Sequence, residues 1–263
     1  MLGAMPGDST VRKGLRRIVP KPVRSAVRQA LRGATPRTRS DAPQAAGGPP
    51  RHGPNDPGGI DRLHVGCGPK NLMADWWNVD IRSFKGVDEV ADVTAPWPWR
   101  DLDYVYGEHF LEHLTLDQAV AFLRQVRGGL RPGGKIRLST PGLEWVWHTH
   151  FRSEESAANV VADTYRANRA FHGWGHQFLY SRPFLERLLA ASGLTDVRFF
   201  AFGESDDPNL RGLERHGAYE VVHGWPNVWN VEATRPASDG PEPSGEFAEE
   251  IEQEFVRYVR DGH

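Results

Sequence analysis

The stretch that decides the fold of this chain is Leu63-His64-Val65-Gly66-Cys67-Gly68, followed by Trp77-Asn78-Val79-Asp80-Ile81. The first run reads as an apolar strand that ends in Gly-x-Gly, where the missing Cβ atoms let the backbone come close to a ligand. The second run reads as another strand, and an acid at its end can accept hydrogen bonds from both hydroxyls of a ribose. The two runs together predict a nucleoside-binding site, with Asp80 as the ribose-binding acid.

The turn after the first strand departs from the dinucleotide pattern Gly-x-Gly-x-x-Gly, because Asn71 stands where the third glycine would be. That glycine belongs to the pyrophosphate-binding form of the turn, so its absence disfavours NAD and favours a cofactor without phosphates. Only eleven residues separate Gly68 from Asp80. A full helix and a strand do not fit into that length, since a helix rises only about 1.5 Å per residue. We therefore expect a short turn in place of the first crossover helix.

Downstream, strand-like and helix-like patterns alternate, which is typical of a parallel sheet covered by helices. We expect strands at 62–66, 76–81, 87–93, 102–106, 135–139, 197–202 and 229–234. We expect helices at 114–130, 154–170 and 182–192. The sequence therefore predicts a Rossmann-like α/β domain over residues 61–236.

Two flanking zones differ from this domain in composition. Residues 1–60 are rich in Arg, Pro, Gly and Ala, and the part from Arg12 to Arg39 holds ten Lys or Arg and no acid. We expect this extension to be disordered or loosely helical, and its basic faces over residues 11–39 suit a peripheral contact with an anionic membrane. A flexible, solvated tail is the alternative. Residues 237–263 form a polar, acidic tail in which 247–259 has the pattern of a short helix.

Composition excludes several classes of protein. The chain has 263 residues, 39% of them hydrophobic and 25% charged, with a net charge of −2, so no overall positive field favours nucleic acid. Its single cysteine, Cys67, permits no intrachain disulfide and fits a reducing compartment. No apolar run approaches the roughly 20 residues of a membrane span. We expect a cytoplasmic protein, with the basic extension as its contact to the inner membrane face.

The motifs from residue 62 to residue 141 resemble those of the class I S-adenosylmethionine-dependent methyltransferases, and residues 171–235 resemble them more loosely. The resemblance implies S-adenosylmethionine as the cofactor. It also implies that the cofactor is bound by the Gly-x-Gly motif, the ribose-binding acid, an adenine-contacting segment and the end of the fourth strand. These residues are Gly66, Cys67, Gly68, Asp80, Ile81, Asp92, Val93, Glu108 and His109. The compact first crossover resembles predicted methyltransferases found with bacterial surface-polysaccharide genes, which implies a glycan or glycolipid acceptor.

A second pattern competes for the same residues. His109-Phe110-Leu111-Glu112-His113 matches His-x-x-Glu-His, a zinc-protease motif in which two histidines share one face of a helix. Here the motif follows a buried strand within a Rossmann pattern, and the methyltransferase resemblance explains it without a metal. We therefore expect no metal, and we expect Glu112 and His113 to brace the start of the next helix. A paired metal among the histidines and acids of the acceptor loops is the alternative, although no ligand spacing in the sequence demands it.

The acceptor side is less defined. Ligands of doubly wound sheets lie beyond the carboxyl ends of the strands, and two long segments, 141–180 and 203–227, leave those ends. Methylation of a hydroxyl benefits from a general base, and His176 is the preferred candidate, followed by His172, although either could be an ordinary loop or core histidine. The candidates for acceptor binding are His148, Trp174, Tyr180, Ser205 and Arg211.

The leading functional hypothesis is therefore O-methylation of a sugar hydroxyl on a bacterial glycan or glycolipid. A small-molecule or natural-product methyltransferase is the second hypothesis. The third is a non-catalytic, cofactor-binding partner subunit.

Overall fold

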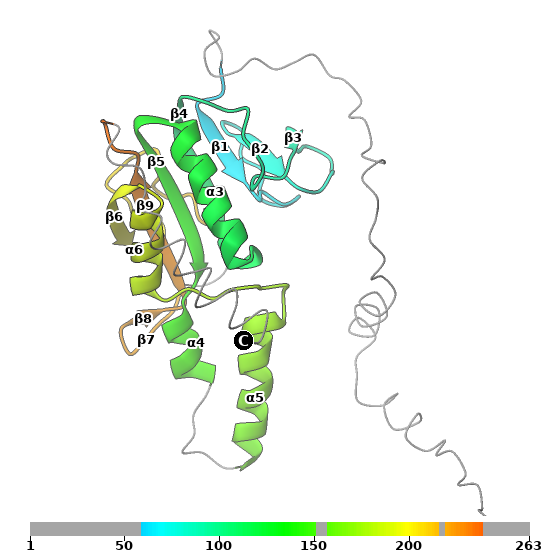
Figure 1. Cartoon of the computed structure of the whole chain (residues 1–263). Coiled ribbons are helices and arrows are strands. Elements are labelled where there is room, and N and C mark those ends of the chain that lie inside the picture. Colours follow the sequence, from blue (N-terminus) through cyan, green and yellow to red (C-terminus); the bar gives the residue numbers. More distant parts are fainter. Residues whose placement is uncertain (1–58, 151–156, 216–218, 239–263) are drawn as a thin grey trace, which may run out of the picture. The chain divides into compact units, whose positions relative to one another are not determined.

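The computed structural model describes residues 59–150, 157–215 and 219–238 (Figure 1). The basic extension with its expected membrane contact at 11–39, the helix expected at 247–259 and the start of the helix expected at 154–170 lie outside the described residues. Among the helices of the described part, none is long and apolar enough to cross a membrane.

The centre of the fold is a sheet of seven strands in the order β3-β2-β1-β4-β5-β9-β6. The pairs from β3 to β5 are parallel, whereas β9 runs antiparallel to both of its neighbours. The strands are β1 (Arg62–Val65), β2 (Trp77–Asp80), β3 (Glu89–Val90), β4 (Leu102–Glu108), β5 (Leu130–Pro141), β6 (Thr195–Phe200) and β9 (Val228–Thr234). The expected Rossmann-like sheet is confirmed. The expected short crossover is also present, since residues 66–76 between β1 and β2 form turns.

One face of the sheet is apolar and is covered by α3 (Leu116–Gly129) and α6 (Arg182–Ala191) (Figure 1). The buried apolar residues of α3 recur at helical spacing and pack against strand residues of the same face: Leu116, Ala119, Phe122, Leu123 and Val126. At the start of α3, the Gln118 side chain accepts a hydrogen bond from Thr115 N, and Ser181 caps α6 through Phe184 N. A short 3-10 turn, η1 (Leu111–His113), precedes α3, and α3 begins at Leu116, two residues after the start of the helix expected at 114–130.

Two more helices, α4 (Leu143–His150) and α5 (Ala157–His172), lie beyond the carboxyl ends of the strands (Figure 1). A small hairpin of β7 (Val221–Val222) and β8 (Trp225–Pro226) accompanies them. The sequence predicted α5 but not α4. The reason is that Val146 is the one fully buried side chain of this eight-residue helix, so α4 carries no apolar periodicity that a pattern could reveal.

The other face of the sheet is polar. In-register pairing aligns one residue from each of six strands across it, and side chains of adjacent strands at one register point to the same face. This polar row runs Asn78, His64, Tyr106, Arg137, Glu232, Arg198. A loop of residues 201–215, and not a helix, lies over these side chains, and the first five of them are buried.

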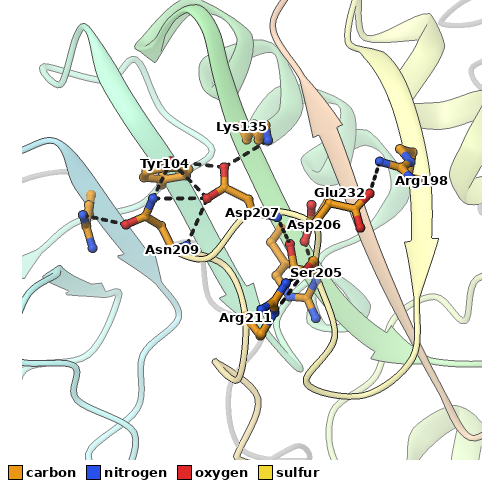
Figure 2. Close-up of polar contacts among 11 residues, drawn as sticks. Tyr104, Lys135, Arg198, Ser205, Asp206, Asp207, Asn209, Arg211 and Glu232 are labelled. Carbon is orange, nitrogen blue, oxygen red and sulfur yellow. Dashed lines mark hydrogen bonds and ion pairs between the residues drawn. The ribbon is translucent and has the colours of Figure 1, made fainter.

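Specific polar contacts attach this loop to the sheet (Figure 2). Asp207 accepts hydrogen bonds from Lys135 Nζ at 3.0 Å and from Tyr104 Oη at 3.2 Å. Glu214, also from the loop, pairs with the fully buried Arg137, whose guanidinium pairs on its other side with Glu232. The loop continues to the site, because Arg215 N donates to Glu108 Oε1 at the end of β4 (2.7 Å).

Candidate functional site

Two adjoining cavities open at the carboxyl ends of β1, β2 and β4. The first cavity has a volume of about 510 Å³ and the second of about 550 Å³. Gly66, His109, His113 and Trp174 line both of them. All nine residues predicted to bind the cofactor lie on the walls of one cavity or the other, although they come from four separate segments of the chain.

The glycine turn after β1 lies between the two cavities, since Gly66 lines both of them and Cys67 and Gly68 line the second. Gly66 has a φ of +61°, and a Cβ at this position would lie 2.4 Å from Cδ2 of Phe110, so a larger residue would need both a strained backbone and a displaced ring. Cys67 N donates to Val79 O, which holds the turn against β2. Burial raises the pKa of the Cys67 thiol to about 12, so this cysteine stays protonated and is not a nucleophile.

Asp80 ends β2 with its carboxylate buried at the base of the first cavity; the residue is 4% exposed. Oδ2 accepts a hydrogen bond from Gly68 N at 3.0 Å, and Oδ1 accepts from Arg82 N at 2.9 Å and from Arg82 Nε at 3.1 Å. Burial works to raise the pKa of Asp80, but the hydrogen bonds from Arg82 and Gly68 and the charge of Arg82 outweigh it, so the pKa lies below its ordinary value. Arg82 Nη2 also donates to Oδ2 at 3.5 Å, so the carboxylate is ionised and Arg82 supplies three of its four hydrogen bonds.

The rest of the first cavity is a mixed apolar and polar wall. Ile81 is 69% exposed on this wall, and Val93 lies buried opposite the strand end. Asp92 accepts hydrogen bonds from Thr94 N at 2.9 Å and Thr94 Oγ1 at 2.7 Å, which fixes the turn after β3. These residues offer apolar surface for a flat ring and acceptor oxygens at its edge.

His109 links the first cavity to the second. Its φ of +48° is unusual for a residue with a side chain, and such conformations cluster at functional sites. Its Nδ1 pairs with Glu112 Oε1 at 3.1 Å, and Glu112 is fully buried. Burial lowers the pKa of His109. The hydrogen bond to Glu112 and the charges of Glu112 and Glu108 raise it by a larger amount, so the pKa lies above its ordinary value.

His176 lines the second cavity and is 8% exposed. Its Nδ1 lies 2.7 Å from Ala170 O, and its ring lies 5.2 Å from that of His113 in an edge-to-face arrangement. Beside it, Trp174 is 57% exposed, with the guanidinium of Arg169 4.4 Å from its ring centre. Of the predicted catalytic and acceptor-binding residues, His176 and Trp174 are the two that the structure brings to the cavities.

The other five lie elsewhere in the described fold. His172 is exposed at the end of α5, and His148 stacks on Trp225 with their rings 7° from parallel. Tyr180 is fully buried in the core under α6, and burial raises the pKa of its phenol. Ser205 and Arg211 lie in the loop over the polar face, where the Arg211 guanidinium donates to Ser205 O. These five residues were expected near the site because they lie in segments that follow strand ends. In the structure, the paths of those segments carry the five residues away from the cavities.

The structure adds wall residues that the sequence analysis passed over. Arg82 was missed, although it stands two residues after the ribose-binding acid. Lys70 and Asn71 extend the glycine turn along the second cavity. Glu112 and His113 also line the second cavity, so they do more than brace α3. The sequence signals for Glu112 and His113 were the His-x-x-Glu-His spacing and the resemblance of this stretch to a methyltransferase motif.

The comparisons with known proteins find similarity in structure. No protein-family model and no curated protein matches the sequence. A methyltransferase from Methanosarcina mazei aligns over 67% of this chain and 92% of its own, with 14% identity and a TM-score of 0.42. One from Archaeoglobus fulgidus aligns over 67% and 86%, with 17% identity and a TM-score of 0.40.

The S-adenosylmethionine-dependent methyltransferase SibL aligns over 56% of this chain with 18% identity and a TM-score of 0.36. The alignment covers 35% of the SibL chain, so this chain spans about a third of that protein. Similarity at this level concerns the fold, and the activity depends on the residues of the site.

Proposed function

We propose that this protein binds S-adenosylmethionine across the first cavity and the glycine turn and transfers its methyl group to a hydroxyl in the second cavity. The observation that carries the proposal is the buried, ionised carboxylate of Asp80 beside the Gly66-Cys67-Gly68 turn. A carboxylate at the end of the second strand is placed to accept both ribose hydroxyls. Ile81 and Val93 supply the apolar walls for an adenine ring, and Asp92 supplies an acceptor at its edge.

The reaction that this arrangement serves is an in-line displacement, which requires alignment of the acceptor with the methyl group. The acceptor oxygen attacks the methyl carbon while the carbon–sulfur bond breaks, and the electron pair stays on sulfur, giving neutral S-adenosylhomocysteine. The acceptor's proton must leave to a base or be made acidic first. Nε2 of His176 is the candidate atom in the second cavity, since its Nδ1 is engaged by Ala170 O.

For the acceptor we propose a sugar hydroxyl of a glycan or glycolipid. Trp174 supports this choice, because its exposed ring lines both cavities and an aromatic face suits the apolar face of a sugar ring. Lys70, Asn71 and Glu108 on the wall of the second cavity provide polar groups for the hydroxyls. The basic extension at 11–39, as a membrane contact, would bring a lipid-linked sugar to this cavity.

Cofactor binding is tested by calorimetric titration of S-adenosylmethionine into the full chain and its Asp80→Ala variant. We expect the substitution to weaken binding by about 10- to 100-fold, because hydrogen bonds to a charged group contribute about 1.5–3 kcal/mol. Asp206→Ala is the matched control, since Asp206 is an exposed acid paired with Arg198 away from both cavities. No binding by the unaltered chain, or equal binding by Asp80→Ala, would contradict the proposal.

Transfer is tested with S-adenosylmethionine labelled in its methyl group and fractionated bacterial glycans, glycolipids and small metabolites. Label in the carbohydrate fractions, recovered as O-methyl sugar after hydrolysis, is the expected result. Label in the small-metabolite fraction alone would favour a small-molecule methyltransferase. Cofactor binding without transfer to any fraction would favour a non-catalytic partner subunit.

A further inference from the structure

Three side chains able to bind a metal converge on the second cavity. Glu112 and His113 come from η1, and His176 comes from the loop after α5, more than 60 residues later in the sequence. One ligand atom from each lies within 4.8 Å of the others, and all three residues line the second cavity. Glu112 and His176 are buried, whereas His113 is exposed.

The hydrogen bonds of the two histidines prepare them as ligands. Nδ1 of His176 lies 2.7 Å from Ala170 O, and Nδ1 of His113 lies 3.4 Å from Gly175 O. A carbonyl oxygen only accepts, so Nδ1 carries the proton in both rings and Nε2 carries a lone pair. Histidines that bind metals have this same arrangement, in which the outer nitrogen donates to a carbonyl or carboxylate and thereby fixes the ring.

Glu112 supplies the negative charge. It is fully buried, and within the described residues its carboxylate bonds to Thr140 Oγ1 at 3.1 Å and to His109 Nδ1 at 3.1 Å. Neither partner is a lysine or an arginine, and the one that can carry a positive charge is His109, which forms an ion pair with Glu112 when it is protonated. A buried carboxylate is expensive unless a cation compensates it, and a bound ion among the three ligand atoms would do so.

We propose that Glu112, His113 and His176 bind a divalent transition-metal ion such as Zn²⁺ or Mn²⁺. Two imidazole nitrogens and one carboxylate oxygen suit these ions, whereas Mg²⁺ and Ca²⁺ prefer oxygen ligands alone. Ligand atoms lie about 2.1 Å from such an ion, and the three ligand atoms lie within 4.8 Å of one another here, so they can surround an ion with at most a small contraction. Three protein ligands leave a further position open toward the cavity.

The role of this ion rests on the proposed methyltransferase function. An acceptor hydroxyl in the open position would be bound to a Lewis acid, which makes it more acidic. Its proton would leave to water, its oxygen would attack the methyl carbon and the carbon–sulfur bond would break with the electron pair on sulfur. His176 would then be a metal ligand and not the general base.

The test uses the tag-free full chain, treated with EDTA, dialysed and titrated with Co²⁺ or Zn²⁺ by calorimetry. Visible absorption of bound Co²⁺ provides a readout that is independent of activity. We expect a single equivalent to bind, and we expect His113→Gln and His176→Gln each to weaken it by at least about 100-fold, the upper end of the effect of losing an outer-sphere partner. The matched control is His172→Gln, because His172 is an exposed histidine outside both cavities. It should bind like the unaltered chain.

Two results would overturn the metal site: no binding of either ion at micromolar concentration, or binding that persists in the His113→Gln/His176→Gln double variant. His113 is exposed, so its variant remains informative if His176→Gln does not fold. S-adenosylmethionine titrations of the same samples separate the two proposals. Intact cofactor binding without metal binding removes the ion alone, and metal binding without cofactor binding removes the methyltransferase alone.

Discussion

The two faces of the sheet are buried by different means. On the apolar face, α3 and α6 cover leucine, valine and isoleucine side chains, and the contacts are non-directional. On the polar face, the 201–215 loop covers the row from Asn78 to Glu232, and hydrogen bonds and ion pairs with fixed partners join an apolar contact of Leu210 with Trp76 and Tyr106. An apolar face tolerates rearrangement, whereas a buried polar face depends on every partner being present. The polar face is also the one joined to the site, through Arg215 and Glu108.

The largest effect should come from Arg137→Ala. Arg137 is fully buried between Glu214 and Glu232, so its removal leaves two carboxylates without their cation. We expect the free energy of unfolding to fall by about 4 kcal/mol, since breaking a buried ion pair from one side has effects of roughly 3–5 kcal/mol. Urea unfolding followed by fluorescence measures it.

The control removes all three charges together, as Arg137→Met with Glu214→Gln and Glu232→Gln. It should recover at least about half of the loss, because no unpaired charge remains buried. A triple variant as unstable as Arg137→Ala would show that packing, and not charge, determines the stability of this face.

The next effect is the dependence of stability on pH that His64 gives to the polar face. Burial lowers the pKa of His64 from 6.5 to about 4, against the opposing influence of Asn78, Glu108 and Asp80 and with a smaller contribution from Arg215. In the unfolded chain His64 therefore binds a proton below about pH 6.5, whereas in the folded chain it binds one only below about pH 4. Stability present above pH 6.5 is lost as the pH falls, by about 2 kcal/mol at pH 5.

This loss is measured as the difference in unfolding free energy between pH 7 and pH 5, for the unaltered chain and for His64→Gln. The variant keeps a hydrogen-bond donor for Asn78 Oδ1 but has no group that titrates. Its stability should change less between the two pH values. Leu123→Ala, on the apolar face, should keep the full pH dependence of the unaltered chain, and a loss of that dependence would contradict the assignment to His64.

The smallest effect should come from Tyr104→Phe, which removes one anchor of the 201–215 loop. The hydroxyl of Tyr104 donates to Asp207 and accepts from Asn209 Nδ2 at 3.0 Å. We expect a stability loss of about 1 kcal/mol, typical of one hydrogen bond. Hydrogen exchange should become faster in the loop while α3 keeps its protection. Equal acceleration in both would mean that the loop does not open separately from the rest.

Strands β1 and β2 and the glycine turn between them could be predicted from the sequence, because the features that specify them are local. Alternating apolar residues, glycines at a turn with positive φ and an acid at a strand end are each specified by neighbours in the sequence. For this reason Gly66, Gly68, Asp80 and Asp92 lie where they were expected. The short crossover was equally predictable, because chain length alone excludes a helix between β1 and β2.

By itself, the sequence thus determined the sheet, the shortened crossover and the residues that line the first cavity and the glycine turn. Only the tertiary structure decided which loop residues reach the cavities, because loop paths depend on packing against distant elements. It buried Tyr180 in the core and carried Ser205 and Arg211 over the polar face. It also brought His176 to Glu112 and His113. No local pattern encodes that meeting, since it requires η1 and the loop after α5 to fold against each other at the end of the sheet.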